Sequence, residues 1–223
     1  MNRLGGLCAL CTQPCTKRGT PKIEGGETAF APRSGSATTA ASLLEALRES
    51  TRSAHEGLDA AFSRLDLAQA RDYETFLRAH FIALAPLQTV YHDFCRQTLD
   101  LSPPDLLALL RRDLADLDVE TQSLPTLTAE DAILAAPAGL AYVLAGSRLG
   151  LTVIGKQPHF GADANAPSRF MDDTEGLGVW RTLSAWLKRQ PGTGEQADAA
   201  VASATGTFVH FHAALAACDL ARD

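Results

Sequence analysis

The spacing of apolar residues predicts a helical chain from about residue 42 onward. The apolar face of the first predicted helix recurs at steps of three or four and consists of Leu44, Leu47, Thr51, Ala54, Leu58, Phe62 and Leu65. Ser42 directly precedes this run and is a suitable N-cap, because its hydroxyl can accept a backbone N–H. A second helical tract covers about 68–99, and Pro86 inside it predicts a kink or a break between two helices.

The rest of the chain continues the helical pattern between segments of turn-forming residues. Ser102-Pro103-Pro104-Asp105 interrupts the pattern, and residues 155–173 are rich in Pro, Gly, Asp and Asn, which predicts a long loop. Further helices are expected at 106–117, 178–189 and 195–217. Another helical segment is expected to begin at Thr128 and Asp131, which resemble a capping box, and to reach about residue 154. No internal repeat and no hairpin pattern is visible, so the sequence predicts an all-α fold, a single compact helical bundle.

Residues 1–40 differ from the rest because they are rich in Gly, Pro, Ser and Thr and lack any regular period. They predict a flexible N-terminal leader in front of a helical domain over 41–223. Cys8, Cys11 and Cys15 lie in this leader and could bind zinc or an iron–sulfur cluster if a fourth ligand came from elsewhere. The alternatives are an unstructured extension or a start codon placed too far upstream.

Composition narrows the class of protein. The net charge is −6 and the basic residues form no strip, which disfavours a nucleic-acid partner. The longest run without charged residues or histidine, 132–147, is shorter than the roughly 18 apolar residues of a membrane span and contains Pro137 and Gly139. Neither a transmembrane helix nor a secretory signal is expected. Three of the five cysteines lie in the first stretch, and Cys95 and Cys218 stand alone in helical patterns. This distribution suits a reducing compartment better than a disulfide scaffold, so we expect a cytoplasmic protein.

The first predicted helix carries a stripe of ionisable residues, namely Arg48, Arg52, His55 and Asp59. Their spacing of four, three and four places them along one side of a helix. Asp59 lies where its carboxylate could accept the Nδ1 proton of His55, leaving Nε2 as a neutral metal ligand. The alternative interpretation is a surface helix edge with ion pairs and a half-buried histidine.

A later helix carries glycines on one face. Gly139, Gly146 and Gly150 are separated by seven and four residues, and each glycine costs about 1 kcal/mol relative to alanine in a helix interior. A face without side chains lets a flat ligand or another backbone approach to van der Waals distance. The alternative interpretation is plain helix–helix contact through G-x-x-x-G.

These two segments resemble the heme oxygenases. The sequence LRESTRSAH at 47–55, followed by Leu58 and Asp59, resembles their proximal helix. YVLAGSRLG at 142–150 resembles their distal helix in bacterial members, including those associated with bacteriophytochromes. The resemblance covers about 42–215 and implies a bundle of the heme oxygenase type. It also implies a heme-degrading oxidoreductase that cleaves its bound heme, with O2 and electrons, to biliverdin, CO and ferrous iron.

The resemblance also implies roles for individual residues. His55 would be the heme iron ligand, and Asp59 would fix its tautomer. Gly146, Ser147 and Gly150 would form the catalytic distal face. The remaining heme-binding assignments are Arg48 and Arg52 for the propionates, Arg181 as a weaker candidate for them, Tyr142 in the distal segment, and Phe208, which alternatively is an ordinary core residue.

Two positions depart from the family pattern. Ser147 stands where vertebrate members carry a distal Asp, and its hydroxyl can hold a water but carries no negative charge. Leu151 stands where many members have another glycine, which is expected to stiffen or narrow the distal helix and to affect which meso carbon is attacked.

Other readings and partners stay open on sequence alone. A protein of the same fold could bind or transfer heme without degrading it, and a helical enzyme of the related thiaminase-like fold would bind no heme. His80, His92, His159, His210 and His212 offer no second metal site by their spacing.

By analogy with the family, the electron donor is a ferredoxin or a flavoprotein reductase. Biliverdin would pass to a bacteriophytochrome, or the reaction would serve iron acquisition.

Overall fold

The computed structural model describes residues 41–156, 158–162 and 166–220. The predicted leader, with Cys8, Cys11 and Cys15, lies outside the described residues. The regular elements of the described part are helices, which confirms the all-α prediction there. They are α1 (Leu43–Phe62), α2 (Ala70–Leu84), α3 (Gln88–Leu99), α4 (Leu106–Ala115), η1 (Thr121–Ser123), α5 (Asp131–Ala135), α6 (Pro137–Ile154), η2 (Phe160–Ala162), α7 (Arg169–Asp172), α8 (Glu175–Leu187) and α9 (Glu195–Leu220).

Helix α1 begins where the sequence predicts, at a complete capping box. The backbone N–H of Glu45 donates to Ser42 Oγ at 3.4 Å, and the backbone N–H of Ser42 donates to Glu45 Oε2 at 2.8 Å. These two bonds satisfy donors that a helix N-terminus otherwise leaves without partners. The predicted N-cap Ser42 is therefore confirmed.

The break at Pro86 is also confirmed. Helix α2 ends at Leu84 and α3 begins at Gln88, because proline has no N–H to donate to the preceding turn. The Ser102–Asp105 interruption likewise ends at a helix start, where the backbone N–H of Ala108 donates to Asp105 Oδ1 at 2.9 Å. Both boundaries follow from local chemistry.

Two local predictions were wrong. The pair Thr128 and Asp131 forms no capping box, since the N-cap of α5 is Glu130 and has no side-chain cap bond. The segment that follows is two helices, because Pro137 begins a new one.

The stretch 155–173 is not entirely loop, since η2 and α7 lie within it. Helix α8 begins at Glu175, three residues before the predicted Gly178. Its early start reflects Asp173, whose carboxylate accepts the N–H groups of Glu175 and Gly176 at 3.2 and 3.3 Å.

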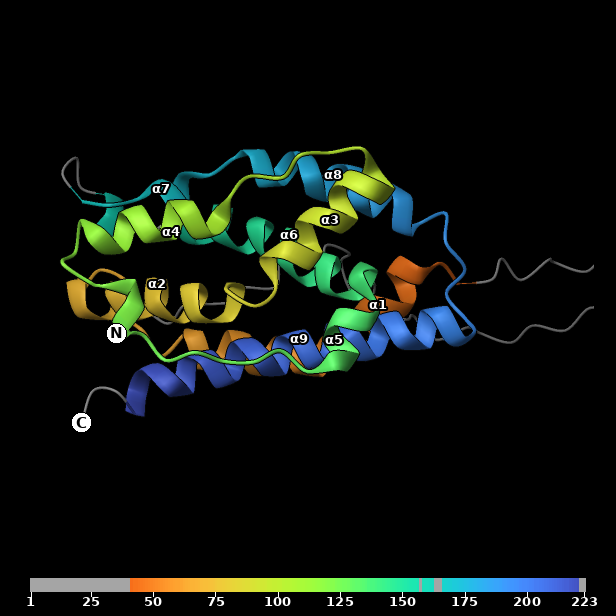
Figure 1. Ribbon diagram of the computed structural model, residues 1–223, viewed down its shortest axis with the longest axis horizontal. Helices are drawn as coiled ribbons and strands as arrows, with labels where there is room; N and C mark the ends of the chain where they lie inside the picture. The colour runs from red at the N-terminus through yellow and green to blue at the C-terminus, as the bar shows by residue number, and fades with distance from the viewer. Residues whose placement is uncertain (1–40, 157, 163–165, 221–223) are drawn as a thin grey trace, which may run out of the picture.

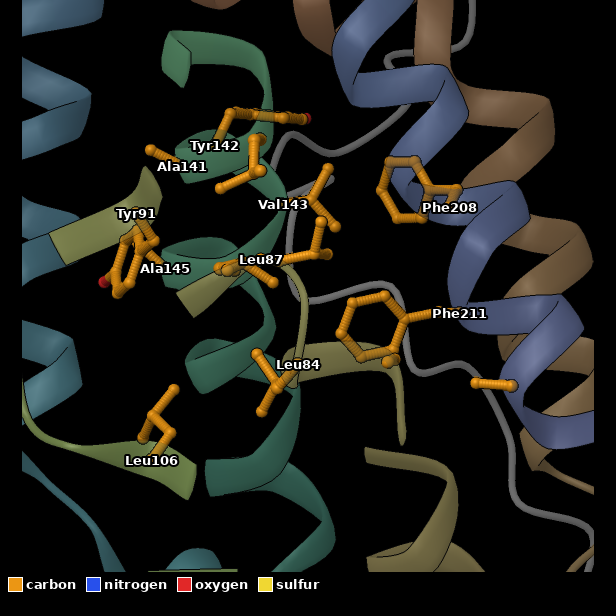
Figure 2. Packing of buried hydrophobic residues seen from close by; sticks show 14 of the residues in the cluster. Leu84, Leu87, Tyr91, Leu106, Ala141, Tyr142, Val143, Ala145, Phe208 and Phe211 are labelled. Atoms are coloured by element: carbon orange, nitrogen blue, oxygen red, sulfur yellow. The ribbon is translucent and has the colours of Figure 1, made fainter. Parts of the chain in front are cut away.

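The helices are arranged around α6. In Figure 1 the long α9 runs along one side of the molecule with α1 beside it, α7 and α8 lie on the opposite side, and α6 passes between them. Helix α6 packs against α9, α8 and α3, and its residues 139–146 are all buried. Figure 2 shows Val143 on the side of α6 that faces Phe208 and Phe211 of α9, whereas Ala145 and Tyr91 lie on its other side.

Among the described residues, two helices are long and apolar enough to cross a membrane by length and composition alone. They are Pro137–Ile154 and Glu195–Cys218, of which 61% and 50% are buried inside the molecule. In the described bundle both contribute buried side chains to the hydrophobic core, and core helices of soluble proteins pass the same test.

Candidate functional site

A cavity lies between α1, α2, α6 and α9. The volume of this cavity is about 90 Å³, and the cavity is partly open to solvent. Helices α1 and α6 both pack against α9 but make almost no contact with each other among the described residues, so the cavity separates them. Its described lining consists of His55, Leu58, Asp59, Phe62, Phe76, His80, Val143, Gly146, Ser147, Gly150, Leu151, Ile154, Phe208 and Phe211.

The α1 wall holds an imidazole against a carboxylate. His55 Nδ1 lies 3.1 Å from Asp59 Oδ2, one helical turn further on. A carboxylate accepts, so Nδ1 carries the proton in this contact and Nε2 keeps its lone pair. The side chains are 18% and 29% exposed, so the imidazole stays accessible from the cavity. Phe208 of α9 meets the His55 ring edge-on, with centroids 5.4 Å apart.

The α6 wall is formed partly by backbone. Gly146 and Gly150 line the cavity without side chains, and Leu151 lines it beside them. Ser147 also lines the cavity, but its hydroxyl donates to the Leu144 carbonyl at 2.8 Å. Its proton is therefore engaged by the helix, and only its lone pairs remain to accept from a ligand or a water.

Gly139, the third glycine of this helix face, contacts another helix and does not line the cavity. A Cβ on Gly139 would lie 2.0 Å from the carbonyl oxygen of Ala200, so this glycine is required by the close approach of α6 to α9. The two interpretations of the glycine face thus hold at different positions. Gly139 serves helix–helix contact, whereas Gly146 and Gly150 line the cavity.

His80 of α2 is a cavity residue that the sequence reasoning missed. Its Nδ1 lies 2.8 Å from the Phe76 carbonyl, which can only accept, so Nδ1 carries the proton and Nε2 keeps its lone pair. Burial lowers the pKa of His80 to about 4, which keeps the ring neutral at pH 7. The His80 ring contacts the rings of Phe62, Phe76, Phe170 and Phe211.

A signal for His80 was present in the sequence. Tyr73, Phe76, Leu77, His80 and Leu84 are all buried and follow each other at steps of one, three or four along α2. A histidine inside such an apolar face marks an imidazole in the core. The pattern could not indicate that this part of the core is hollow. Phe211, which also lines the cavity, was missed for the same reason.

Four of the residues that the resemblance assigned to heme do not line the cavity formed by the described residues. Arg48 and Arg181 are exposed. Arg52 is exposed and forms an ion pair with Glu49, Nη2 to Oε2 2.5 Å. Tyr142 is buried with its ring 5.8 Å from that of Trp180 on α8. The assigned residues that the structure brings together are His55, Asp59, Gly146, Ser147, Gly150 and Phe208.

The donor set of the cavity limits the kind of metal that it suits. Within the described ranges no group of three or more His, Cys, Asp and Glu side chains is placed to hold a metal ion. His55 offers one imidazole held by a carboxylate, and the surrounding walls are mainly aliphatic and aromatic. The described lining contains two imidazoles, His55 and His80, and each could give one ligand to a metal whose other ligands come from elsewhere, such as the macrocycle of a heme.

No protein-family model matches this chain, and no curated protein is similar to it by sequence.

Proposed function

We propose that the protein binds heme between α1 and α6 and degrades it as a biliverdin-producing oxygenase. The observation that carries the proposal is the placement of the His55–Asp59 pair and of Gly146 and Gly150 on two helices that the same cavity separates. An oriented imidazole suits an iron ligand, and a wall of backbone suits the face of a flat ring. The likeness of 47–59 and 142–150 to the two heme-contacting helices of the heme oxygenases supports the same choice.

Different residues of the cavity contact different parts of the proposed heme. His55 is the iron ligand, and Asp59 holds it in the tautomer whose Nε2 can bind a metal. Phe208, Phe211 and Phe62 supply apolar surface for the ring. Heme in this cavity would supply both the iron that activates O2 and the ring that is oxidised, with biliverdin, CO and ferrous iron as products.

The propionates need cations at the edge of the cavity, and the described wall contains none. Arg48 and Arg52 lie two turns and one turn before His55 on α1, and both are exposed. Arg52 is held by Glu49 in an exposed ion pair, which is weak enough to exchange for a propionate. We therefore retain these two arginines as the propionate partners. A cytoplasmic location, a ferredoxin or flavoprotein reductase as electron donor and a bacteriophytochrome as biliverdin acceptor remain parts of this proposal.

A second candidate is a protein that binds or transfers heme without degrading it. The observation that favours it is Ser147, whose proton is bound to the Leu144 carbonyl, so α6 presents no charged group to organise water at this wall. Oxygen activation needs protons delivered at the distal side, and a hydroxyl with its proton engaged delivers none directly.

Heme titration followed by single turnover tests both candidates. We expect hemin to produce a Soret band that saturates at one heme per chain. Reductant in air should then remove this band while biliverdin absorption grows. A stable oxy complex would instead identify the carrier, and the lack of a Soret band would refute heme binding. His55→Ala should lose the axial histidine signature and regain it with added imidazole, whereas His92→Ala, a histidine that does not line the cavity, should leave the spectrum unchanged.

A further inference from the structure

Arg148 is a buried cation on α6 that the proposed function does not use. It lies between cavity residues in the chain but does not line the cavity, and only 2% of it is exposed. Its Nη2 donates to the Phe170 carbonyl at 2.6 Å and to the Asp173 carbonyl at 3.2 Å, and lies 3.1 Å from Asp173 Oδ2. The guanidinium also lies over the Phe170 ring, 4.7 Å from its centroid. All of these contacts are to the segment 170–173.

The surroundings of Arg148 leave room for its stem and give partners to Nη2, whereas its Nε and Nη1 have no hydrogen-bond partner among the described residues. A Cβ on Gly176 would lie 2.7 Å from Arg148 Cγ, so glycine at this position leaves room for the arginine stem. Asp173 pairs with Arg148 while its carboxylate also accepts the N–H groups of Glu175 and Gly176. The start of α8 is thereby tied to the same contact. The desolvation that lowers the pKa of Arg148 is opposed by the charge of Asp173.

The segment 170–173, which Arg148 contacts, also packs against a residue of the cavity wall. The backbone N–H of Phe170 donates to the buried carboxylate of Asp113 on α4 at 2.8 Å. The Phe170 ring lies 5.2 Å from the ring of His80, which lines the cavity. Arg148 therefore connects the middle of the Gly146–Gly150 stretch of α6 to the packing behind His80.

An apolar side chain could fill the space of Arg148 with less desolvation, so the charge needs an explanation. Bonds to two carbonyls and a carboxylate have fixed directions, whereas apolar contacts permit a helix to slide or rotate. Near its N-terminus α6 is held by the close approach of Gly139 to α9, and Arg148 supplies directional contacts in its second half.

We infer that Arg148 is a positioning residue: from the side away from the cavity it fixes α6 to the segment 170–173, and so sets the place of the Gly146–Gly150 wall relative to His80. The geometric part of this inference concerns the protein without any ligand. Its consequence, control of how the ring of a bound heme faces α6, rests on the proposed function.

Hydrogen exchange of the ligand-free protein, followed by mass spectrometry, tests the geometric part. In Arg148→Met we expect amides in 146–154 and 168–176 to exchange at least about tenfold faster, while amides in α1 and the middle of α9 keep their rates. Asp173→Asn keeps the shape and a capping oxygen and should show the same pattern to a smaller degree. Arg148→Lys keeps the charge but not the planar guanidinium that lies over the Phe170 ring, and should fall between wild type and Arg148→Met.

Ser203→Ala is the matched control. Ser203 is fully buried and donates to the Ile133 carbonyl at 2.8 Å, so its removal breaks a buried bond between α9 and α5 without touching Arg148. It should leave exchange in 146–154 at the wild-type rate. Unchanged exchange in 146–154 of both Arg148→Met and Asp173→Asn, or an equal acceleration in every helix, would overturn the inference.

Product analysis separates this inference from the proposed function. If wild type degrades heme, Arg148→Met should change the ratio of biliverdin isomers on chromatography, which a mere loss of stability would not do. An unchanged ratio would overturn the consequence for heme. If wild type binds no heme while the local exchange pattern appears, the proposed function fails and the positioning role of Arg148 stands.

Discussion

His55 Nδ1 and Asp59 Oδ2 lie 3.1 Å apart across one turn of α1, at the wall of the cavity that separates α1 from α6. A carboxylate in this position orients the imidazole and fixes the tautomer with the proton on Nδ1, which favours a metal on Nε2.

Replacement of Asp59 should therefore weaken heme binding without unfolding the protein. We expect Asp59→Asn to reduce heme affinity by about tenfold or more, because the amide neither carries charge nor selects the tautomer as firmly. Spectroscopic titration with hemin measures the change. Glu56→Gln, an exposed carboxylate on the same helix that does not line the cavity, is the control and should bind as wild type does. Equal affinity of Asp59→Asn and wild type would remove Asp59 from the site.

A side chain at Gly146 should fill the space that the cavity offers to a ring. We expect Gly146→Leu to reduce heme affinity by at least about tenfold, since a bound ring and a leucine would occupy the same volume. Urea unfolding should show a folded variant, because the added side chain enters a cavity. Wild-type heme binding by a folded Gly146→Leu protein would contradict the assignment of this wall.

Two glycines should respond to alanine in opposite directions. Gly139→Ala should destabilise the fold by about 1–3 kcal/mol, because its Cβ would lie 2.0 Å from the Ala200 carbonyl oxygen and the helices would have to move apart. Gly57→Ala should stabilise it by about 0.5–1 kcal/mol, since Gly57 is an exposed helix residue with nothing within 4 Å of the added Cβ. The free energies of unfolding in urea decide both, and the same sign for both variants would contradict the described packing.

His80 should make the fold sensitive to acid. Burial lowers its pKa to about 4, so between about pH 6.5 and pH 4 the unfolded chain binds a proton that the folded chain does not. This contribution to stability is complete above pH 6.5 and is lost as the pH falls toward 4, by up to about 3 kcal/mol.

The variant His80→Leu isolates that contribution. Its free energy of unfolding should fall less than that of wild type between pH 7 and pH 4.5, as measured in urea at each pH. His210, whose pKa is also lowered by burial, remains in both proteins and serves as the internal reference. Parallel losses in the two proteins would show that His80 does not titrate as its burial requires.

Much of the candidate site is local in the sequence and was predicted from it. His55 and Asp59 are four residues apart on one helix, so the helical period alone brings them together. The capping box at Ser42 and the break at Pro86 are equally local. The pair Thr128 and Asp131 has similar spacing but forms no cap, because the chain enters α5 at Glu130. Spacing predicts a contact only where the backbone is already helical.

The sequence by itself determined the all-α class, the main helices and the residues that share a face within each helix, because these depend on neighbours a few positions apart. Only the tertiary structure decided that Gly139 contacts α9 while Gly146 lines a cavity, that His80 lies in the same cavity, and that Arg148 reaches Asp173. The physical reason is that a helix face has the same pattern whether it meets another helix or a hollow. Which of the two it meets depends on how distant segments fill space around it.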